Sequence, residues 1–266
     1  MPMQRLITFT TDFGLTEHYV GVMKGVIYGI NPGVGILDVT NAVQPFDILD
    51  GALAISQAYT FFPKDTIHLV VVDPGVGSAR RPILVTAGQY QFVAPDNGVL
   101  SFIYEREESV IVRHITSEHY FRSPVSSTFH GRDVFAPVAA YLSKGVEASK
   151  FGDPVTDYVR FAVPKPKPTS PNSWKAVVLK TDRFGNLITN ITPAELPQIF
   201  NGNSFKLSVG KAEVTKLCSS YAQGGQGELF AILGSTGFLE VSTNRGAASR
   251  LAAADKGSEV NVAIAG

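Results

Sequence analysis

The stretch V-V-D-P-G-V-G-S-A-R-R, residues 71–81, is the part of this chain from which the fold is most readily predicted. It continues an apolar, β-branched run, residues 66–72, typical of a strand that is buried on both faces of a sheet. Pro74 fixes its own φ and favours an extended Asp73, while the glycines that follow permit a tight turn. We therefore expect the Asp73 carboxylate at the carboxyl end of a core strand, where open α/β sheets bind ligands. Arg80 lies within reach if the loop folds back, although an ordinary turn capped by aspartate would give the same pattern.

Strand and helix patterns alternate along the first 160 residues. The strand patterns cover residues 6–10, 35–39, 66–72, 82–87, 91–94 and 110–115. The helix patterns cover residues 19–30, 48–59 and 134–142, with one short helix after residue 98. This alternation predicts a three-layer α/β domain with a mostly parallel sheet.

The composition changes at V-P-K-P-K-P-T-S-P, residues 163–171, where alternating prolines favour an extended, semi-rigid spacer. Short strand patterns with glycine turns follow, at residues 174–180, 187–191, 204–209, 229–233, 238–241 and 259–264. We thus expect an N-terminal α/β domain over residues 1–162, a linker over 163–173, and an antiparallel, β-barrel-like domain over 174–266.

Charge and composition exclude several classes of function. Lys and Arg total 23 and Asp and Glu total 23, so the net charge is zero and no nucleic-acid footprint or membrane-surface patch is indicated. No apolar run reaches the roughly 18 residues of a membrane span. The single cysteine, Cys218, cannot form an internal disulfide, which favours a reducing compartment. We expect a soluble, cytoplasmic protein without a nucleic-acid or membrane partner.

Asp12 ends the first predicted strand in the string T-T-D-F-G. The D-F-G resembles the metal-binding motif of kinases only superficially, because the glycine-rich loop, the V-A-I-K lysine and the H-R-D loop are missing. A carboxylate at a strand end could accept both hydroxyls of a ribose, as acidic residues do in nucleotide sites. It could also simply cap the following segment.

His130 stands in T-F-H-G-R-D, directly before a predicted helix. A histidine with a pKa near 6.5 can exchange protons at neutral pH, so His130, Asp73 and Arg80 are candidates for a polar triad at the end of the sheet. Asp12, Asp73, His130 and Asp133 could instead bind a metal. The chain lacks close ligand spacing such as H-x-x-x-H, and we therefore expect no metal site.

Two strings in the C-terminal half have residues suited to a flat, zwitterionic ligand: D-R-F-G-N, residues 182–186, and N-R-G-A-A-S, residues 244–249. Phe184 could stack on a ring, and Asn186 offers donors and acceptors to an ammonium or carboxylate group. Each string could also be a glycine hairpin turn with no ligand.

Taken together, these strings resemble the S-adenosyl-L-methionine (SAM) hydroxide adenosyltransferase family, the hydrolytic relatives of fluorinating and chlorinating adenosyl transferases. The resemblance extends in order over nearly the whole chain. The strings that carry it are T-T-D-F-G, D-P-G-V-G, P-D-N-G, F-H-G-R-D, D-R-F-G-N-L-I-T-N and N-R-G-A-A-S. It implies an α/β domain followed by a β-barrel-like domain, and a homotrimer with sites between adjacent subunits. It also implies SAM as substrate, adenosine and L-methionine as products, and no cofactor.

The resemblance also implies roles for individual residues. The triad of the water-using members matches Asp73, Arg80 and His130. On the substrate side, Asp12 would bind the ribose hydroxyls; Phe46, where fluorinating relatives have tryptophan, would line the sugar or sulfonium side; Asp182, Asn186 and Ser235 would hold the methionine portion; Phe184 would stack on adenine; and Arg245 and Ala247 would meet the purine edge through backbone groups.

Three departures bear on the choice of nucleophile and on substrate contacts. Halogenating relatives carry tyrosine at Asp73, and fluorinating ones carry serine at Gly131. A carboxylate beside the nucleophile pocket should repel a halide, so both differences favour water. Thr236 stands where fluorinating relatives have arginine, which leaves the contact to the substrate carboxylate open.

The expected reaction is in-line attack of an activated water on the ribose C5′ of SAM. Asp73 and His130 would orient the water and Arg80 would keep Asp73 ionised, with either Asp73 or His130 accepting the proton. Two alternatives are a halide-using adenosyl transferase and a non-catalytic sensor of SAM or adenosine. Only catalysis requires the triad.

Overall fold

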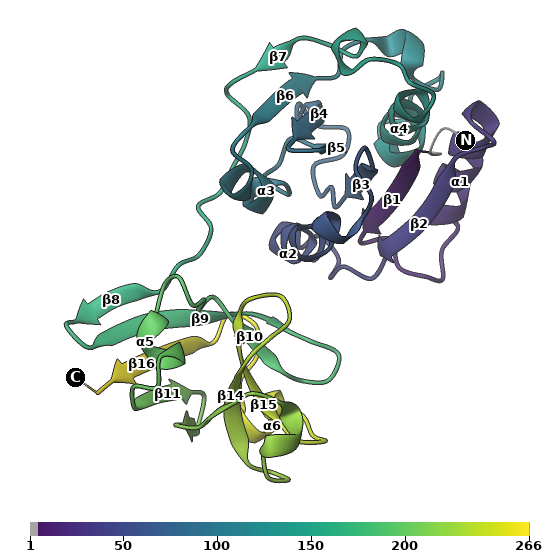
Figure 1. Ribbon diagram of the computed structural model, residues 1–266. Coiled ribbons are helices and arrows are strands. Elements are labelled where there is room, and N and C mark those ends of the chain that lie inside the picture. The colour runs from purple at the N-terminus through teal and green to yellow at the C-terminus, as the bar shows by residue number, and fades with distance from the viewer. Residues whose placement is uncertain (1–4, 266) are drawn as a thin grey trace. The chain divides into compact units, whose positions relative to one another are not determined.

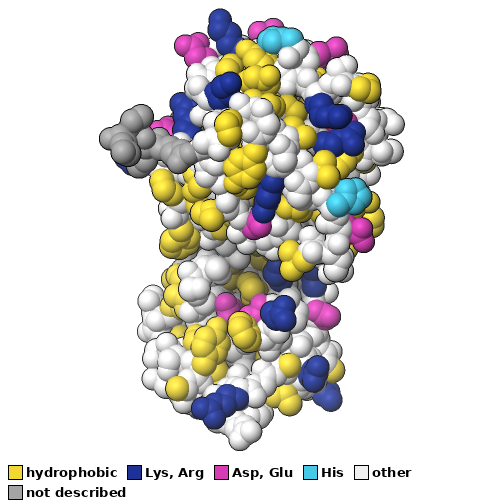
Figure 2. All heavy atoms as spheres, turned by 90° about the vertical axis from the view of Figure 1, so that its right-hand side faces the viewer, with side chains coloured by type: hydrophobic (Ala, Val, Ile, Leu, Met, Phe, Trp, Pro, Cys, Tyr) yellow, Lys and Arg dark blue, Asp and Glu magenta, His cyan; other side chains and the backbone are white. Residues whose placement is uncertain are grey.

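The computed structural model describes residues 5–265, which form two compact units, one ending at Val163 and one beginning at Pro164 (Figure 1). Each unit has its own sheet and its own core. On the face shown in Figure 2, acidic and basic side chains are interspersed, in keeping with the net charge of zero. Within residues 5–265, no helix has the length and apolar character that crossing a membrane requires.

The N-terminal unit is built on a seven-stranded sheet with the order β2-β1-β3-β5-β4-β6-β7. Its strands are β1 (Leu6–Thr11), β2 (Gly35–Thr40), β3 (Ile67–Val71), β4 (Pro82–Ala87), β5 (Tyr90–Pro95), β6 (Val110–His114) and β7 (Pro154–Val155). The α/β class is confirmed. Parallel pairing, however, is confined to β2, β1, β3 and β5, and the other pairs are antiparallel. The sheet is mixed because a short turn at Gly88 (φ +55°) joins β4 to β5, and a hairpin can only be antiparallel.

Helices cover both faces of this sheet and complete the predicted three layers. One face carries α1 (Tyr19–Ile30) and α4 (Ala136–Ser143), and the other carries α2 (Ile48–Ala58) and α3 (Ser101–Arg106) (Figure 1). Short helical turns occur at η1 (Tyr59–Phe61), η2 (Glu118–Tyr120), η3 (Gly131–Phe135) and η4 (Ala148–Lys150). Alternate residues of β3 enter the two cores: Leu69 packs with α1 and α4, and Val70 packs with α2 and α3. The strand is buried on both faces, as predicted.

The C-terminal unit is a curled sheet with the order β12-β11-β16-β9-β10-β15-β14-β13, and β8 pairs with β9. Its strands are β8 (Lys167–Ser170), β9 (Ser173–Thr181), β10 (Leu187–Thr189), β11 (Phe205–Val209), β12 (Ala212–Val214), β13 (Leu217–Cys218), β14 (Leu229–Leu233), β15 (Leu239–Thr243) and β16 (Glu259–Ile264). Helices α5 (Pro197–Phe200) and α6 (Ala248–Ala252) and the turn η5 (Tyr221–Gln223) complete it. Apart from the parallel pair β13 and β14, the strands of this sheet pair in the antiparallel direction. This antiparallel, curled sheet fits the predicted barrel-like domain.

Strand β8 falls inside the proline-rich stretch for which the sequence predicts a linker. It pairs with β9, and Pro168 lies opposite Trp174. A proline removes one backbone donor, so it is tolerated where a strand has a neighbour on only one side. β8 is such an edge strand. The prolines of this stretch therefore predicted a linker, although the edge position allows a strand that contains them.

Candidate active site

Asp73 and Arg80 form an ion pair in the loop that follows β3. The Arg80 Nε donates to Asp73 Oδ1 at 2.9 Å, and Arg80 Nη2 donates to Asp73 Oδ2 at 2.5 Å. Only 6% of the Asp73 side chain and 8% of the Arg80 side chain is exposed. The loop folds back through hydrogen bonds of its own backbone, such as the one from Val76 N to the Asp73 carbonyl. The expected approach of Arg80 to Asp73 is therefore present, in a two-bond geometry that fixes both side chains.

A close contact between two loops brings His130 to this pair. Gly77 has a φ of +77°, and a Cβ there would come within 2.2 Å of the carbonyl oxygen of Ser127. Only glycine lets the two backbones approach so closely. The second loop leads directly to His130, whose Nδ1 lies 2.8 Å from Arg80 Nη2. Asp73, Arg80 and His130 thus lie together, joined through one guanidinium group.

The contact with Arg80 determines the protonation state of His130. A guanidinium group can only donate, so Nδ1 must be the acceptor and the proton of the neutral ring lies on Nε2. Burial lowers the pKa of His130 below its ordinary value of 6.5, and the positive charge of Arg80 lowers it further. His130 is therefore held neutral, with an N–H group at Nε2 available to donate.

Asp133 holds the loop that carries His130. Its side chain is fully buried and accepts from Arg132 Nε at 2.7 Å, from Arg122 Nη1 at 3.4 Å and from Ser126 N at 2.9 Å. Burial alone would raise the pKa of Asp133, but the hydrogen bonds from Arg132 and Ser126 lower it overall. Sequence reasoning considered Asp133 only as a metal ligand. In the structure it supports the loop.

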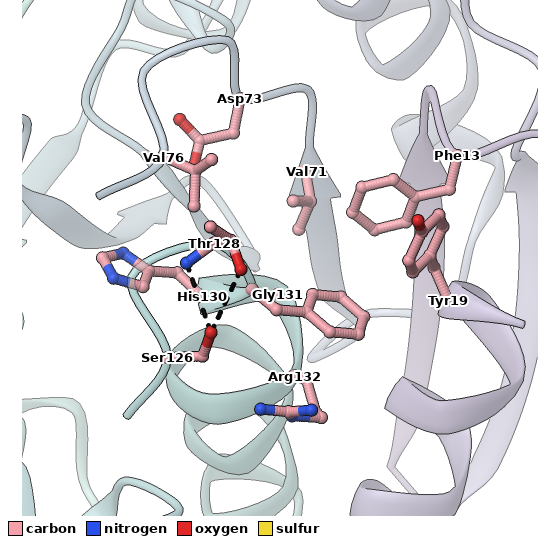
Figure 3. A pocket seen from close by; sticks show the side chains of 11 residues that line it. Phe13, Tyr19, Val71, Asp73, Val76, Ser126, Thr128, His130, Gly131 and Arg132 are labelled. Carbon is pink, nitrogen blue, oxygen red and sulfur yellow. Dashed lines mark hydrogen bonds between the residues drawn. The ribbon is translucent and has the colours of Figure 1, made fainter. Parts of the chain in front are cut away.

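A pocket of about 300 Å³ opens beside Asp73 and His130 (Figure 3). Phe13 and Tyr19 line the side opposite His130, and Phe129 contacts both of their rings edge-on. Its full lining is Phe13, Tyr19, Val71, Asp73, Val76, Ser126, Thr128, Phe129, His130, Gly131 and Arg132. Because a water molecule takes up about 30 Å³ of liquid, this pocket can hold a water together with part of a larger ligand.

Asp12 and Phe46 meet at the same edge of the sheet. Asp12 follows β1, the neighbour of β3, and its Oδ2 accepts from Phe46 N at 2.9 Å. Burial raises the pKa of Asp12, and the negative charge of Asp73 adds to this effect. Phe46 has a φ of +65°, and 72% of the residue is exposed. Such a strained, exposed aromatic residue is unusual and is characteristic of a binding site.

The predicted substrate residues of the C-terminal unit gather around a second pocket, of about 750 Å³. Asp182, Phe184, Asn186, Ser235 and Arg245 all line it. Ala247 is not part of this lining. It packs instead against Gly185, where a Cβ would come within 2.6 Å of the Ala247 Cβ.

Asp182 organises the turn between β9 and β10. Its Oδ1 accepts from the backbone N–H groups of Phe184 and Asn186, and its Oδ2 accepts from the Asn186 side chain. The string D-R-F-G-N is therefore a hairpin turn, one of the two possibilities open from sequence, and 76% of its residue Phe184 is exposed. The same residues thus form the hairpin turn and line the pocket.

Among the residues that line this pocket and that sequence reasoning missed are two with ionisable side chains, Glu240 and Tyr221. Glu240 lies in β15, every residue of which is buried, and its Oε2 accepts from the Tyr221 hydroxyl at 3.0 Å. An acidic residue within the apolar string F-L-E-V was the available signal, because a charge in a buried strand needs a partner. Across residues 5–265 we find no group of three or more His, Cys, Asp or Glu residues arranged to hold a metal ion.

The fold and the first pocket define a class of protein: an α/β protein with a paired carboxylate, guanidinium and neutral imidazole at the carboxyl end of its central parallel strands. Comparison with known families then identifies it. The model of the SAM hydroxide adenosyltransferase N-terminal domain matches residues 7–152, and that of the C-terminal domain matches residues 176–261. The chain belongs to the SAM hydroxide adenosyltransferase family.

Individual relatives agree with this assignment. The chain is 35% identical to an (R)-S-adenosyl-L-methionine hydrolase of Salinispora tropica over 96% of this chain and 97% of that one. It is 34% identical to a protein of the same name from Methanocaldococcus jannaschii, over 97% and 95% of the two chains. A crystal structure of an uncharacterized conserved protein from Thermotoga maritima superposes with a TM-score of 0.90 at 36% identity, covering 97% and 99%. A fluorinase of Actinoplanes is more distant, at 28% identity over 90% and 91%.

Proposed function

We propose that this protein hydrolyses SAM to adenosine and L-methionine. Membership of the hydroxide adenosyltransferase family and the similarity to proteins named (R)-SAM hydrolase support this proposal. The structural observation that carries it is the placement of Arg80 between Asp73 and His130, beside a pocket at the end of β3.

The chemistry is a displacement at the ribose C5′ of SAM. The water oxygen forms a bond to C5′ while the C5′–S bond breaks, and the bonding electrons leave with sulfur as neutral methionine. One water proton is lost, and the other remains in the new hydroxyl group of adenosine. Because the leaving group is a neutral thioether, no acid is needed to help it depart. The protein therefore has to place water in line with the C–S bond, at about 3–3.5 Å from C5′, and accept one proton.

The hydrogen bonds in the triad divide these tasks between two side chains. His130 already carries its proton on Nε2, so that atom can donate to the water oxygen but cannot accept its proton. Asp73 is the remaining group at the pocket that can accept. We assign Asp73 as the proton acceptor, His130 as the group that orients the water, and Arg80 as the group that holds both in place.

Substrate binding follows the residues named from sequence. Asp12 binds the ribose hydroxyls beside Phe46. Asn186 and Ser235 hold the methionine portion together with the turn built by Asp182. Phe184 stacks on adenine, and the backbone groups of Arg245 and Ala247 meet the purine edge. No cofactor or metal forms part of the proposal, since the sulfonium charge already activates the C5′–S bond.

Product analysis tests the proposal directly. The purified protein should release adenosine and methionine in equal amounts from SAM, and in H₂¹⁸O the label should appear in the 5′-hydroxyl of adenosine. Added chloride or fluoride should leave the rate unchanged and yield no halogenated nucleoside, because the Asp73 carboxylate at the pocket repels anions. Binding of SAM without any product after prolonged incubation would instead identify a sensor.

The state of His130 predicts how the rate depends on pH. Protonation of Nδ1 would replace the acceptor facing Arg80 by a second donor and break that contact. Because burial and Arg80 lower the pKa of His130, the neutral ring persists below pH 6.5. We expect kcat/KM to be constant through neutrality and to fall only below pH 6.5. The position of this acid limb should change in His130→Gln and stay unchanged in His119→Gln, whose histidine is exposed. An acid limb at or above pH 6.5 would contradict the assignment.

We further propose that one SAM molecule is bound by the N-terminal pocket of one subunit and the C-terminal pocket of another, in a homotrimer. The proposed reacting groups all lie in the first unit and most of the recognition groups lie in the second, and family resemblance supports the trimer. Co-expression of differently tagged Asp73→Asn and Asn186→Ala chains tests this arrangement. Random mixing should restore about a quarter of the wild-type sites in a closed ring. Inactive mixed oligomers would show that each site is built within one subunit, without affecting the assignment as a hydrolase.

A cytoplasmic location is also part of the proposal. Cys218 is the single cysteine, and it is buried and free. Free thiols persist in reducing compartments. SAM, adenosine and methionine are then the partners, and neither nucleic acid nor a membrane is required.

A further inference from the structure

The string P-D-N-G, residues 95–98, forms the turn between β5 and α3 and contacts both ends of the loop that carries Asp73 and Arg80. At the first end, Asn97 Nδ2 donates to the carbonyl oxygen of Val72, the residue before Asp73, at 2.9 Å. Asn97 does not line the pocket beside Asp73. Its influence on the chemistry therefore has to pass through the loop.

At the second end, Asp96 holds Arg81, the residue after Arg80. The Asp96 N–H group donates to the Arg81 carbonyl at 2.9 Å, and Arg81 Nε donates to Asp96 Oδ2 at 2.9 Å. Only 1% of the Asp96 side chain is exposed, and its Oδ1 accepts from Val159 N at 2.8 Å. Hydrogen bonds to an ionised carboxylate are among the stronger ones in proteins. The turn is therefore firmly held, and Asn97 extends from a fixed backbone.

The Val72 carbonyl lies where the ladders of β3 have ended. The register of β3 with β1 ends at Val71, and its register with β5 ends at Leu69. Figure 3 shows this point between Val71, on the strand, and Asp73, in the loop. Val72 is fully buried, and a buried carbonyl needs a hydrogen-bond partner. The side chain of Asn97 supplies that partner beyond the last ladder pairs.

This hydrogen bond orients the peptide group that joins Val72 to Asp73. A peptide group is planar, so a fixed carbonyl also fixes the direction of the bond to the Asp73 Cα. The following residue, Pro74, restricts the backbone of Asp73 from the other side. The carboxylate therefore extends from a backbone that is held before and after it, and Arg80 holds its two oxygens.

We propose that Asn97 is a positioning residue for hydrolysis, which acts through Asp73 by holding the Val72 carbonyl. This inference rests on the proposed function, in which Asp73 accepts the proton of the attacking water. A displacement of about 1 Å at a reacting group can lower a rate by about 10²-fold. Loss of the Asn97 hydrogen bond should therefore lower kcat and leave substrate binding largely unchanged.

A double-mutant cycle tests this role, with Asn97→Ser introduced into the wild type and into Asp73→Asn. Serine keeps an acceptor for Val99 N, which donates to Asn97 Oδ1 at 3.1 Å, but is too short to reach the Val72 carbonyl. In the wild type, kcat should fall by about 10- to 100-fold, with less than about threefold change in the affinity for uncleaved S-adenosyl-L-homocysteine. In Asp73→Asn, the same substitution should lower kcat by less than about threefold, because the group that Asn97 positions is already lost.

Asn31→Ser is a matched control within the same unit. Asn31 Nδ2 also donates a hydrogen bond, to Ser143 Oγ at 2.8 Å, but it does so at the end of α1 and outside the pocket. Asn31→Ser should lose stability in urea unfolding, as Asn97→Ser does, and keep the wild-type kcat. The comparison separates the loss of a hydrogen bond from the loss of this particular one.

Several results would overturn the inference. An equal loss of kcat in both backgrounds would show that Asn97 supports the unit as a whole and not Asp73. Normal hydrolysis by Asn97→Ser would remove this inference alone, and weaker binding at unchanged kcat would assign Asn97 to substrate binding. Absence of hydrolysis by the wild type would remove the proposed function and this inference with it. If Asn97→Ser does not fold, Asn97→Asp, which keeps the shape but not the donor, should show the same dependence on Asp73.

Discussion

Replacement of Asp73 by asparagine should lower kcat for SAM hydrolysis by about 10²- to 10⁴-fold, the usual contribution of a positioned proton acceptor. Asparagine has nearly the shape of aspartate but cannot accept the proton of water at neutral pH. In the wild type, the guanidinium of Arg80 donates to both carboxylate oxygens of Asp73. The asparagine side chain would place an N–H group against this guanidinium in place of one of those oxygens. The affinity for SAM should change little, because Asp73 acts on the water. Single-turnover kinetics together with a separate binding measurement distinguish these effects.

The structure offers a matched control for this substitution. Asp157 also pairs with an arginine, Arg81, but its side chain is 78% exposed and lies outside the pocket. Asp157→Asn should leave kcat unchanged. Arg80→Lys, which keeps the charge but loses the two-bond geometry, should also reduce kcat, through misplacement of both Asp73 and His130. A value of kcat within about threefold of wild type in Asp73→Asn would remove the acceptor role from this residue.

Acid should destabilise the N-terminal unit through His68, the buried histidine of β3. Its side chain is fully buried among aromatic rings, its Nδ1 lies 2.7 Å from Thr8 Oγ1, and its Nε2 has no hydrogen-bond partner. Burial lowers the pKa of His68 from 6.5 to about 3. Between these two values the unfolded chain binds a proton that the folded chain does not. Stability is therefore complete above pH 6.5 and falls as the pH decreases.

The expected loss is a substantial fraction of a typical free energy of unfolding. Once the pH is well below 6.5 it amounts to about 1.4 kcal/mol per pH unit, or about 3 kcal/mol at pH 4.5, against a total of about 5–15 kcal/mol. Urea unfolding at a series of pH values, with amide exchange in β3 as the readout for this unit, measures it. His68→Gln should remove about this much of the pH dependence, and His119→Gln should remove none. Parallel pH dependences in wild type and His68→Gln would show that other groups account for the acid sensitivity.

Local patterns were sufficient to predict most elements. The β-branched run that becomes β3 and the helical spacing that becomes α1 depend on short-range propensity and periodicity, which the sequence carries directly. The sequence also indicated that residues 82–87 and 91–94 are paired strands, which become β4 and β5. Other pairings depend on neighbours that are remote in the chain, so the sequence did not reveal that β8 pairs with β9 or that β6 pairs antiparallel with β4.

For the candidate site, the sequence by itself determined which residues to propose for the chemistry: an aspartate after a buried strand, an arginine seven positions later, and a histidine before a helix. Only the tertiary structure decided that they lie together. His130 is 50 positions from Arg80, and the two loops meet because Gly77 allows the backbone of Ser127 to approach. That contact places the His130 proton on Nε2. The surroundings of Glu240, a buried acid in β15 that accepts from Tyr221, likewise depend on tertiary packing, because the cost of a buried charge is set by distance and solvent exclusion in three dimensions and not by its neighbours in the chain.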